Sequence, residues 1–332
     1  MQTPDLLASA ASLSPAAYCQ LFYVTAAATV LTIAAAPESI QDLLTQYGAR
    51  SAAEGTPEEK RGKITGDGLL TKAVGWVTSV GKIPHSWFKH FYILSLSCSV
   101  FWAIQFLCHG AILDAIVRNQ ASREPASMSI DQVILMWFLM GLQGARRLYE
   151  YMFVLRPSSS KMWIIHWLLG MAFYSFTSVS IWVEGSSMYR GALLYILLTS
   201  YVDSIHSADR RTFAAATLSF NIIFGVLAFL VSWSMQYRCH SYLSGLKKYS
   251  LPEKGLFKYI VCPHYMCECA LYLSLALVAA PRGRLYNRTL ICALLFVTVN
   301  LGVTANGTKK WYTEKFGREM VQGKWRMIPL VF

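Results

Sequence analysis

A polar block interrupts an otherwise apolar stretch near the middle of the chain, at Gln143, Arg146, Arg147 and Glu150. Spacings of three and four residues put Gln143, one of the arginines and Glu150 on the same face of a helix. One interpretation is a helix end where arginines extend towards water and pair with Glu150. The other is a polar wall that faces an internal cavity. Glutamate and glutamine are costly in apolar surroundings and usually serve a function there, which favours the second interpretation.

Further polar clusters lie in the C-terminal part of the chain, at residues 236–240, 251–268 and 309–332. Each mixes aromatic, basic and hydrogen-bonding side chains beside apolar segments. Within them His264 and Glu268 share one helix face, and Gln236 and His240 share another. Such groups are costly near a bilayer unless they contact each other or a polar ligand. A ligand with several phosphates would satisfy them, so we expect these clusters to bind one.

Cys262, His264, Cys267 and Cys269 at first resemble a set of zinc ligands. Their spacing contains no C-x-x-C pair, and the segment leads into an apolar helix. We therefore predict no metal site and interpret these cysteines as buried thiols. The sequence also has no G-x-G-x-x-G after a strand-like segment and no G-x-x-x-x-G-K-[ST]. A nucleotide would therefore have to bind without a Rossmann fold.

The composition is typical of a membrane protein, because 55% of the 332 residues are hydrophobic and only 14% are charged. The mean hydropathy is +0.38. The net charge of +12 does not indicate nucleic-acid binding, since no basic stripe on a soluble domain accompanies it. The eight cysteines are scattered and predict no disulfide framework. We predict an all-α, polytopic membrane protein.

Seven transmembrane helices are expected, in a single membrane domain that comprises residues 1–332. Their predicted bounds are Ser14–Ala36, Trp87–Ile112, Ile130–Leu155, Met162–Val183, Phe213–Met235, Phe257–Ala280 and Thr289–Ala305. The polar insertion at residues 38–85 is expected to be a cytosolic loop with a mobile middle and an interfacial helix at Leu69–Val80. Gly191–Val202 is apolar but too short to span, and is interpreted as a re-entrant or interfacial segment.

Seven spans would place the termini on opposite sides, and the loop charges indicate the orientation. With a cytosolic C-terminus, the cytosolic segments carry 19 lysines and arginines and the opposite loops carry eight. The positive-inside rule therefore places the C-terminal clusters in the cytosol, where soluble nucleotide cofactors are found. No basic segment precedes the first apolar run, so we interpret that run as a membrane helix rather than a cleaved signal.

The C-terminal clusters carry a family resemblance. The tail K-K-W-Y-x-x-K-F with its R-M-I-P-L-V-F ending is similar to R-F-Y-x-x-x-F and K-A-I-P-F of the steroid 5α-reductase family. L-P-x-x-G-L-F-x-Y-I-x-C-P-H-Y-x-x-E resembles that family's I-P-x-G-x-x-F-x-Y-V-x-x-x-N-Y-x-x-E. Q-Y-R-C-H and G-A-R-R-L-Y-E are similar to the polyprenol (polyprenal) reductase branch, which makes dolichol precursors for protein N-glycosylation at the endoplasmic reticulum. The family-like region is 128–332, and the N-terminal part agrees only in layout.

This resemblance implies a seven-helix bundle in which NADPH lies among the helices on the cytosolic side. The residues that it implies for cofactor binding are Gln236, Arg238, His240, Tyr249, His264, Tyr265, Glu268, Lys310 and Tyr312. The sequence departs from the family where Ser250 replaces an arginine and where Met320-Val321 replaces a Tyr-Pro pair. One extra residue also precedes Ile328-Pro329. These departures concern the contacts of the tail.

The implied chemistry favours an aldehyde as the immediate substrate. Hydride is nucleophilic and adds to the β-carbon of an α,β-unsaturated carbonyl much more readily than to the alkene of an allylic alcohol. Hydride would reach C3 of polyprenal and a proton would reach C2, which gives dolichal. Gln143 and Arg146 are the candidate donors to the developing enolate oxygen, and Glu150 would hold the arginine or help to move a proton. Arg238 and neighbouring lysines would neutralise the cofactor's phosphates.

Other functions stay open at the level of the sequence. A steroid or other enone reductase of the same family would use the same cofactor on a smaller lipid. A membrane methyltransferase of the isoprenylcysteine type shares the polar C-terminal layout and would bind S-adenosylmethionine. A membrane transporter or receptor is disfavoured, because the polar clusters gather on one side and the hydropathy shows no internal repeat.

Overall fold

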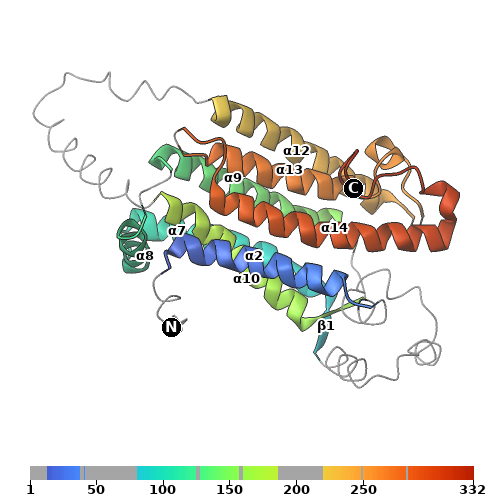
Figure 1. Cartoon of the computed structure of the whole chain (residues 1–332), viewed down its shortest axis with the longest axis horizontal. Helices are drawn as coiled ribbons and strands as arrows, with labels where there is room; N and C mark the ends of the chain where they lie inside the picture. Colours follow the sequence, from blue (N-terminus) through green and yellow to red (C-terminus); the bar gives the residue numbers. More distant parts are fainter. Residues whose placement is uncertain are drawn as a thin grey trace, which may run out of the picture.

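The computed structural model describes residues 13–37, 41, 81–124, 128–156, 160–185, 220–247, 250–281 and 283–332. Over these residues the chain forms a bundle of long helices with one small two-stranded sheet (Figure 1). The predicted all-α class is therefore confirmed. The predictions for the middle of the 38–85 insertion, for Leu69–Val80 and for Gly191–Val202 lie outside the described residues.

The α-helices are α2 (Pro15–Ala34), α7 (Lys89–Leu107), α8 (Ala111–Ala121), α9 (Ile130–Tyr149), α10 (Ile164–Glu184), α12 (Phe220–Gly245), α13 (Pro263–Val278) and α14 (Arg288–Phe316). Short 3-10 turns occupy His85–Phe88, Gly255–Lys258 and Arg318–Met320, and a π-helical turn, η2, continues α9 over Glu150–Val154. Strands β1 (Lys82–Pro84) and β2 (Lys161–Trp163) pair antiparallel, with Ile83 opposite Met162.

Five helical segments of the described chain are long and apolar enough to cross a membrane: Pro15–Ala34, His85–Leu107, Ile164–Glu184, Phe220–Gly245 and Arg288–Phe316. A polytopic membrane protein is thus supported by length and composition. The two other predicted spans are helical as well, but α9 carries the polar block and α13 has only 16 residues. Neither is among the five, so the predicted number of seven spans is not established by this criterion.

The second predicted span, Trp87–Ile112, was placed wrongly at its end. Helix α7 stops at Leu107, and α8 begins at Ala111 after a break that holds His109 at a positive φ of 52°. Gln105 stabilises this break, because its side-chain Oε1 accepts from the backbone N–H of Leu113 at 3.3 Å. All of these residues are compatible with an apolar run, so hydropathy does not reveal the break.

The fifth and seventh predicted spans ended too early. Helix α12 continues ten residues past Met235 to Gly245, and α14 continues past Ala305 to Phe316. The polar cluster 236–240 is therefore part of a helix rather than of a loop. The sixth span, predicted as Phe257–Ala280, begins instead at Pro263, a residue suited to the first helical turn. Polar residues interrupt a hydropathy profile without interrupting the helical hydrogen bonds.

Local caps join α9 to α13. Ser129 and Gln132 form a capping box at the start of α9. The Gln132 amide also donates to the carbonyl oxygens of Val278 and Ala280, both at 2.9 Å. These carbonyls belong to the end of α13, where helical partners are lacking. One glutamine therefore fixes the start of α9 against the end of α13.

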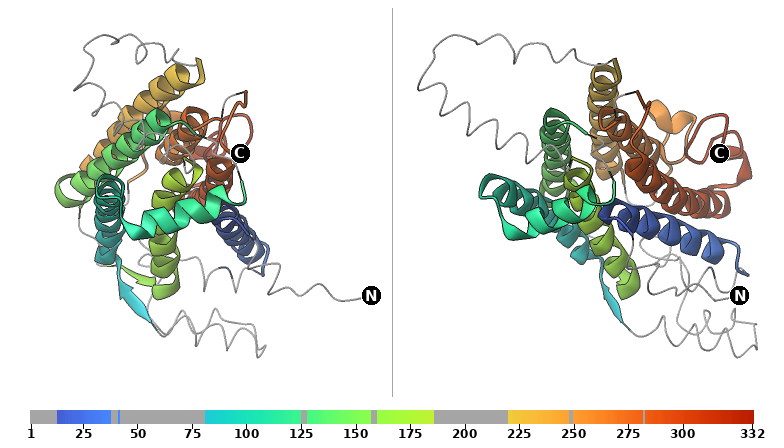
Figure 2. Two further views of the ribbon diagram at one scale, coloured as in Figure 1. Left: turned by 90° about the vertical axis from the view of Figure 1, so that its left-hand side faces the viewer. Right: turned by 60° about the vertical axis from the view of Figure 1, so that its left-hand side comes forward.

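The packing order of the helices is α12, α13, α14, α2, α10, α7, α9, with each helix packed mainly on its neighbours in this series (Figure 2). One hydrophobic cluster joins α7, α8, α9 and α10 to α12 and α13, and a second joins α2 and α10 to α13 and α14. The two ends of the series, α9 and α12, approach each other chiefly through the η2 turn. The bundle is therefore closed on the α2–α14 side and has a seam between α9 and α12.

The C-terminal tail folds back over the start of α13. Its backbone pairs in parallel with the segment before α13, since Val261 N–H donates to Trp325 O at 2.8 Å and Cys262 N–H donates to Arg326 O at 3.0 Å. The Lys324 ammonium donates to Pro252 O at 3.3 Å, and partial burial lowers the pKa of this lysine. The clusters 251–268 and 309–332, which are far apart in sequence, thus lie side by side.

Close packing of α12 on α13 depends on Gly225. A Cβ atom at this position would lie 2.7 Å from Val278 Cγ2 and 3.0 Å from the backbone oxygen of Ser274. Gly225→Ala should therefore destabilise the protein by ~1–3 kcal/mol through overpacking. Gly141→Ala is the matched control, because a Cβ there meets nothing within 4 Å. Thermal unfolding in detergent should show a lower Tm for Gly225→Ala alone, and equal Tm values for both variants would contradict this packing.

Candidate functional site

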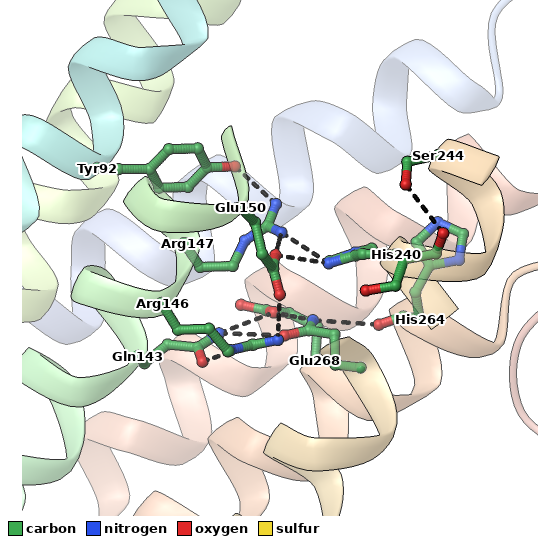
Figure 3. A network of polar contacts seen from close by, with 11 residues as sticks. Tyr92, Gln143, Arg146, Arg147, Glu150, His240, Ser244, His264 and Glu268 are labelled. Atoms are coloured by element: carbon green, nitrogen blue, oxygen red, sulfur yellow. Dashed lines mark hydrogen bonds and ion pairs between the residues drawn. The ribbon is translucent and has the colours of Figure 1, made fainter. Parts of the chain in front are cut away.

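The polar block of α9 forms a hydrogen-bonded network with α12 and α13 (Figure 3). Within α9, Arg146 Nη1 donates to Glu150 Oε1 at 2.6 Å, and Arg147 Nη1 forms an ion pair with Glu150 Oε2. Glu150 is the first residue of the π-helical turn, a feature that often occurs at functional positions. The predicted common face of Gln143, Arg146 and Glu150 is confirmed, since Arg146 Nη2 also donates to Gln143 Oε1 at 2.7 Å.

Helix α12 contributes Gln236 and His240. Arg146 Nη2 donates to Gln236 Oε1, and Gln143 Nε2 lies 3.3 Å from the same oxygen. His240 Nδ1 lies 2.8 Å from Glu150 Oε2 and 2.8 Å from Arg147 Nη1. One ring nitrogen cannot donate to the carboxylate and accept from the guanidinium at once, so the proton on His240 decides which contact forms. His240 shares a helix face with Gln236, as expected, and both residues contact α9.

Helix α13 completes the network through Glu268. Gln236 Nε2 donates to Glu268 Oε2, and Gln143 Nε2 lies 3.4 Å from the same atom. Gln236 Nε2 also lies 3.3 Å from the backbone oxygen of His264. The His264 ring faces the His240 ring edge-on, with centroids 5.5 Å apart. Helices from distant parts of the chain therefore meet at one polar centre.

The network is buried and its formal charges balance. The side chain of Glu150 is 0% exposed, that of Arg146 is 4% exposed and that of Arg147 is 18% exposed. Both guanidinium groups pair with the carboxylate of Glu150, and the carboxylate of Glu268 accepts from the amide of Gln236. Buried charges are tolerated when they are paired and hydrogen-bonded, and the Arg146–Arg147–Glu150 cluster meets both conditions.

Tyr92 of α7 is part of the network, although the sequence analysis missed it. Its hydroxyl accepts from Arg147 Nη2 at 2.7 Å, and its ring lies 5.0 Å from the guanidinium carbon of the same arginine. The residue is 4% exposed and lies in an apolar run. A tyrosine hydroxyl needs a hydrogen-bond partner when it is buried. A tyrosine within an apolar run is therefore the one signal in the sequence that could have pointed to this role.

Several residues expected to bind the cofactor lie outside this network. Arg238 is exposed in a groove that Arg146 also lines, and Lys310 is exposed near the end of α14. Tyr265 and Tyr312 pack against the second hydrophobic cluster, next to the tail. Tyr249 lies outside the described residues. The remaining expected residues, Gln236, His240, His264 and Glu268, are brought together.

Four cysteines in and next to α12 and α13 lie in the hydrophobic interior. Cys239, Cys262, Cys267 and Cys269 are all buried, which confirms their interpretation as buried thiols. Thr298 Oγ1 lies 3.6 Å from Cys269 Sγ, so this thiol takes part in helix packing between α13 and α14.

Four buried polar atoms in this region have no hydrogen-bond partner among the described residues. They are Arg146 Nε, Trp233 Nε1, Ser241 Oγ and His264 Nδ1. A buried donor without a partner costs free energy, and such atoms in native proteins usually serve a ligand or a reaction. The first two lie at the α9–α12 seam, and the last two lie where α12 meets α13.

The sequence model of the family described as 3-oxo-5-alpha-steroid 4-dehydrogenase matches residues 186–332. A polyprenal reductase from Saccharomyces cerevisiae is 31% identical over 198 residues, which cover 59% of this chain and 64% of the yeast protein. Polyprenal reductases from Xenopus tropicalis and Drosophila melanogaster are each 26% identical, over 75% and 81% of this chain and 80% and 82% of their own lengths.

The chain is thus similar to the steroid 5α-reductase family in its C-terminal part. Polyprenal reductases from yeast to vertebrates match it, which confirms the resemblance that the Q-Y-R-C-H and G-A-R-R-L-Y-E motifs suggested. Both motifs lie in the network, at its α12 and α9 walls. The match to the yeast protein spans slightly less than two thirds of that protein's length.

The network makes a prediction about stability. Glu150→Gln should destabilise the protein by about 3–5 kcal/mol, because it leaves Arg146 and Arg147 buried with one carboxylate fewer. Asp114→Asn is the matched control, since it removes one partner of the exposed Arg118–Asp114 pair at 2.6 Å and should change stability by less than ~1 kcal/mol. Thermal unfolding in detergent measures both, and similar Tm values for the two variants would contradict a structural role for the buried pair.

Proposed function

We propose that this protein reduces the carbon–carbon double bond next to the carbonyl of a polyprenal, with NADPH as reductant. The proposal is supported by the similarity to the family and by the names of the relatives. The observation that carries it is the buried Nε–H of Arg146. This group has no partner among the described residues, while both terminal nitrogens of the same guanidinium are engaged.

The chemistry needs a donor at the substrate oxygen. When hydride adds to the β-carbon of an enal, negative charge develops on the carbonyl oxygen, and a preorganised N–H stabilises it most effectively in a site that excludes water. Arg146 Nη1 is directed to Glu150, and Nη2 is directed to Gln143 and Gln236. Nε is the nitrogen of this guanidinium that has no acceptor among the described residues. We therefore assign the oxygen contact to Arg146.

We propose a positioning role for Gln143 in place of the donor role that the sequence suggested. Its Oε1 accepts from Arg146 at 2.7 Å, while its Nε2 lies 3.3–3.4 Å from Gln236 and Glu268. Both ends of the amide are thus engaged within the protein. We propose that Gln143 and Glu150 position Arg146, and that His240 holds a proton beside Glu150, 2.8 Å from the carboxylate.

The residues present fit a dinucleotide cofactor. His264 Nδ1 and Ser241 Oγ are buried atoms without partners, at the end of the bundle where the tail packs on the start of α13. Exposed basic side chains, among them Lys247 and Lys310, lie near the same end and suit phosphate groups. NADPH would supply the hydride. Gln236, His240, His264 and Glu268 would contact it, with Lys310 and Tyr312 nearer to its phosphates.

The same proposal includes seven spans and a cytosolic C-terminus in the endoplasmic reticulum membrane. Helix α9 with its π-helical turn covers Ile130–Val154, which at 1.5 Å per residue is long enough to cross ~30 Å of hydrocarbon. Its charges are paired inside the bundle. Helix α13 packs between α12 and α14. The excess of lysine and arginine on the C-terminal side supports the orientation.

The direct test offers NADPH and one lipid at a time to detergent-purified protein. Polyprenal, polyprenol and a 3-keto-4-ene steroid serve as the three lipids, and NADPH oxidation is followed by absorbance. Turnover is expected with polyprenal, because only an activated alkene accepts hydride readily. Turnover with the steroid alone would retain the family chemistry and reject the isoprenoid substrate.

Arg146→Lys tests the assignment of the oxygen contact. Lysine keeps the positive charge beside Glu150 but removes the Nε donor and the fork geometry. Loss of one such donor should lower kcat by ~10²–10³-fold. The exposed pair supplies the control, because Arg118→Lys makes the same change at a position 55% exposed and should leave kcat unchanged. A kcat for Arg146→Lys within a few-fold of the wild type would remove Arg146 from this role.

A further inference from the structure

The seam between α9 and α12 contains a groove of about 670 Å³. Its walls include Leu142, Ala145 and Tyr149 from α9, and Trp233 and Tyr237 from α12. This volume lies in the range of small-molecule pockets, roughly 300–1,000 Å³. The groove lies between α9 and α12, which stand at opposite ends of the packing order. It therefore separates two helices that are not direct packing neighbours.

The outer surface beside the groove is apolar. Phe138 of α9 is 57% exposed and Val231 of α12 is 57% exposed. Side chains of this kind on a membrane-spanning helix face lipid rather than water. The groove therefore opens to the hydrocarbon of the bilayer, and its natural occupant is a molecule dissolved there.

The inner side of the groove is polar. Arg146 belongs to its lining and is 6% exposed, and its Nε has no partner among the described residues. Trp233 also lines the groove, and its Nε1 lacks a partner in the same part of the chain. The guanidinium carbon of Arg146 lies 5.2 Å from the centroid of the Trp233 ring. Two unpartnered N–H donors from facing helices thus lie close together.

These donors specify the ligand. The lining residues include no carboxylate, and neither N–H group has an acceptor among the described residues. A carbonyl oxygen has two lone pairs and can accept from both donors, while an apolar chain attached to it fits the aromatic and aliphatic walls. Arg238 is the second basic residue of the lining, and a phosphorylated headgroup would require the larger set of basic groups at the cofactor end of the bundle.

We propose that the α9–α12 groove is a lateral docking site through which an isoprenoid aldehyde reaches the network directly from the bilayer. Arg146 Nε and Trp233 Nε1 receive its carbonyl oxygen, and the first isoprene units lie along Leu142 and Ala145 with the chain extending into lipid. This inference rests on the proposed function, and it adds the route and a specificity-determining residue, Trp233. Arg146 then faces the substrate on one side and Glu150 on the other.

The first experiment does not depend on turnover. An isoprenoid aldehyde with a diazirine on its second isoprene unit is reconstituted with the wild-type protein in phosphatidylcholine vesicles and photolysed. Labelled peptides should map to residues 138–149 of α9 and 230–238 of α12, and competition by unlabelled polyprenal should abolish the labelling. Labelling elsewhere, or labelling that polyprenal does not compete, overturns the docking site even if the enzyme is active.

The second experiment uses matched substitutions. Ala145→Trp fills the groove and should raise the KM for polyprenal in vesicles about tenfold, as expected for a steric change in an apolar pocket. NADPH binding, measured by thermal shift, should stay unchanged. Ala28→Trp introduces the same side chain at an exposed position of α2, on the closed side of the bundle, and should leave the KM unchanged.

Trp233→Phe keeps the aromatic ring against Arg146 and removes only the Nε1 donor. The expected loss in kcat/KM is about tenfold, as for one hydrogen bond to a substrate oxygen. An unchanged KM for Ala145→Trp overturns the proposal. A raised KM for Ala28→Trp also overturns it, and would place access on the α2 side. If the wild type reduces no enal, the proposed function fails, and the photolabelling pattern still decides the groove.

Discussion

Two arginine side chains from adjacent positions of α9 share the carboxylate of Glu150, which is fully buried. In apolar surroundings neither cation is stable without a partner, so the helix carrying them must fold against elements that supply acceptors. Those acceptors come from Gln236 of α12 and Tyr92 of α7. The ion pair therefore constrains which helices meet α9. As a result, the most polar centre of the bundle lies where α9 meets α12 and α13.

This constraint connects stability to the proposed chemistry. A guanidinium held at both terminal nitrogens cannot rotate freely, so the Nε–H of Arg146 is fixed in direction before a substrate arrives. Preorganisation of this kind is the usual source of electrostatic stabilisation in enzymes. The backbones of α9 and α12 approach each other mainly at the η2 turn, and side chains of the network bridge the seam beside the groove. The access route thus follows from how the charges are satisfied.

The sequence predicted the parts of the site that depend on spacing within one helix. Gln143, Arg146 and Glu150 lie on one face as expected, and the clusters at 236–240 and 251–268 both contribute to the same centre. It did not predict which helices would contact each other, so the contact of His240 with Glu150 was missed. Tyr92 and Trp233 were missed because single aromatic residues in apolar runs have no distinguishing pattern. The predicted helix ends were wrong where polar residues continue a helix, as in α12 and α14.

The position of the transferred hydride tests the central claim most directly. The protein would be incubated with polyprenal and NADPH that carries deuterium at the transferable position, and the product analysed by mass spectrometry and NMR. The account predicts one deuterium at C3, the β-carbon of the α-isoprene unit, in a product that is still an aldehyde. Deuterium at C1 in an alcohol would mean that the enzyme reduces the carbonyl itself, and would contradict the proposed reduction of the double bond.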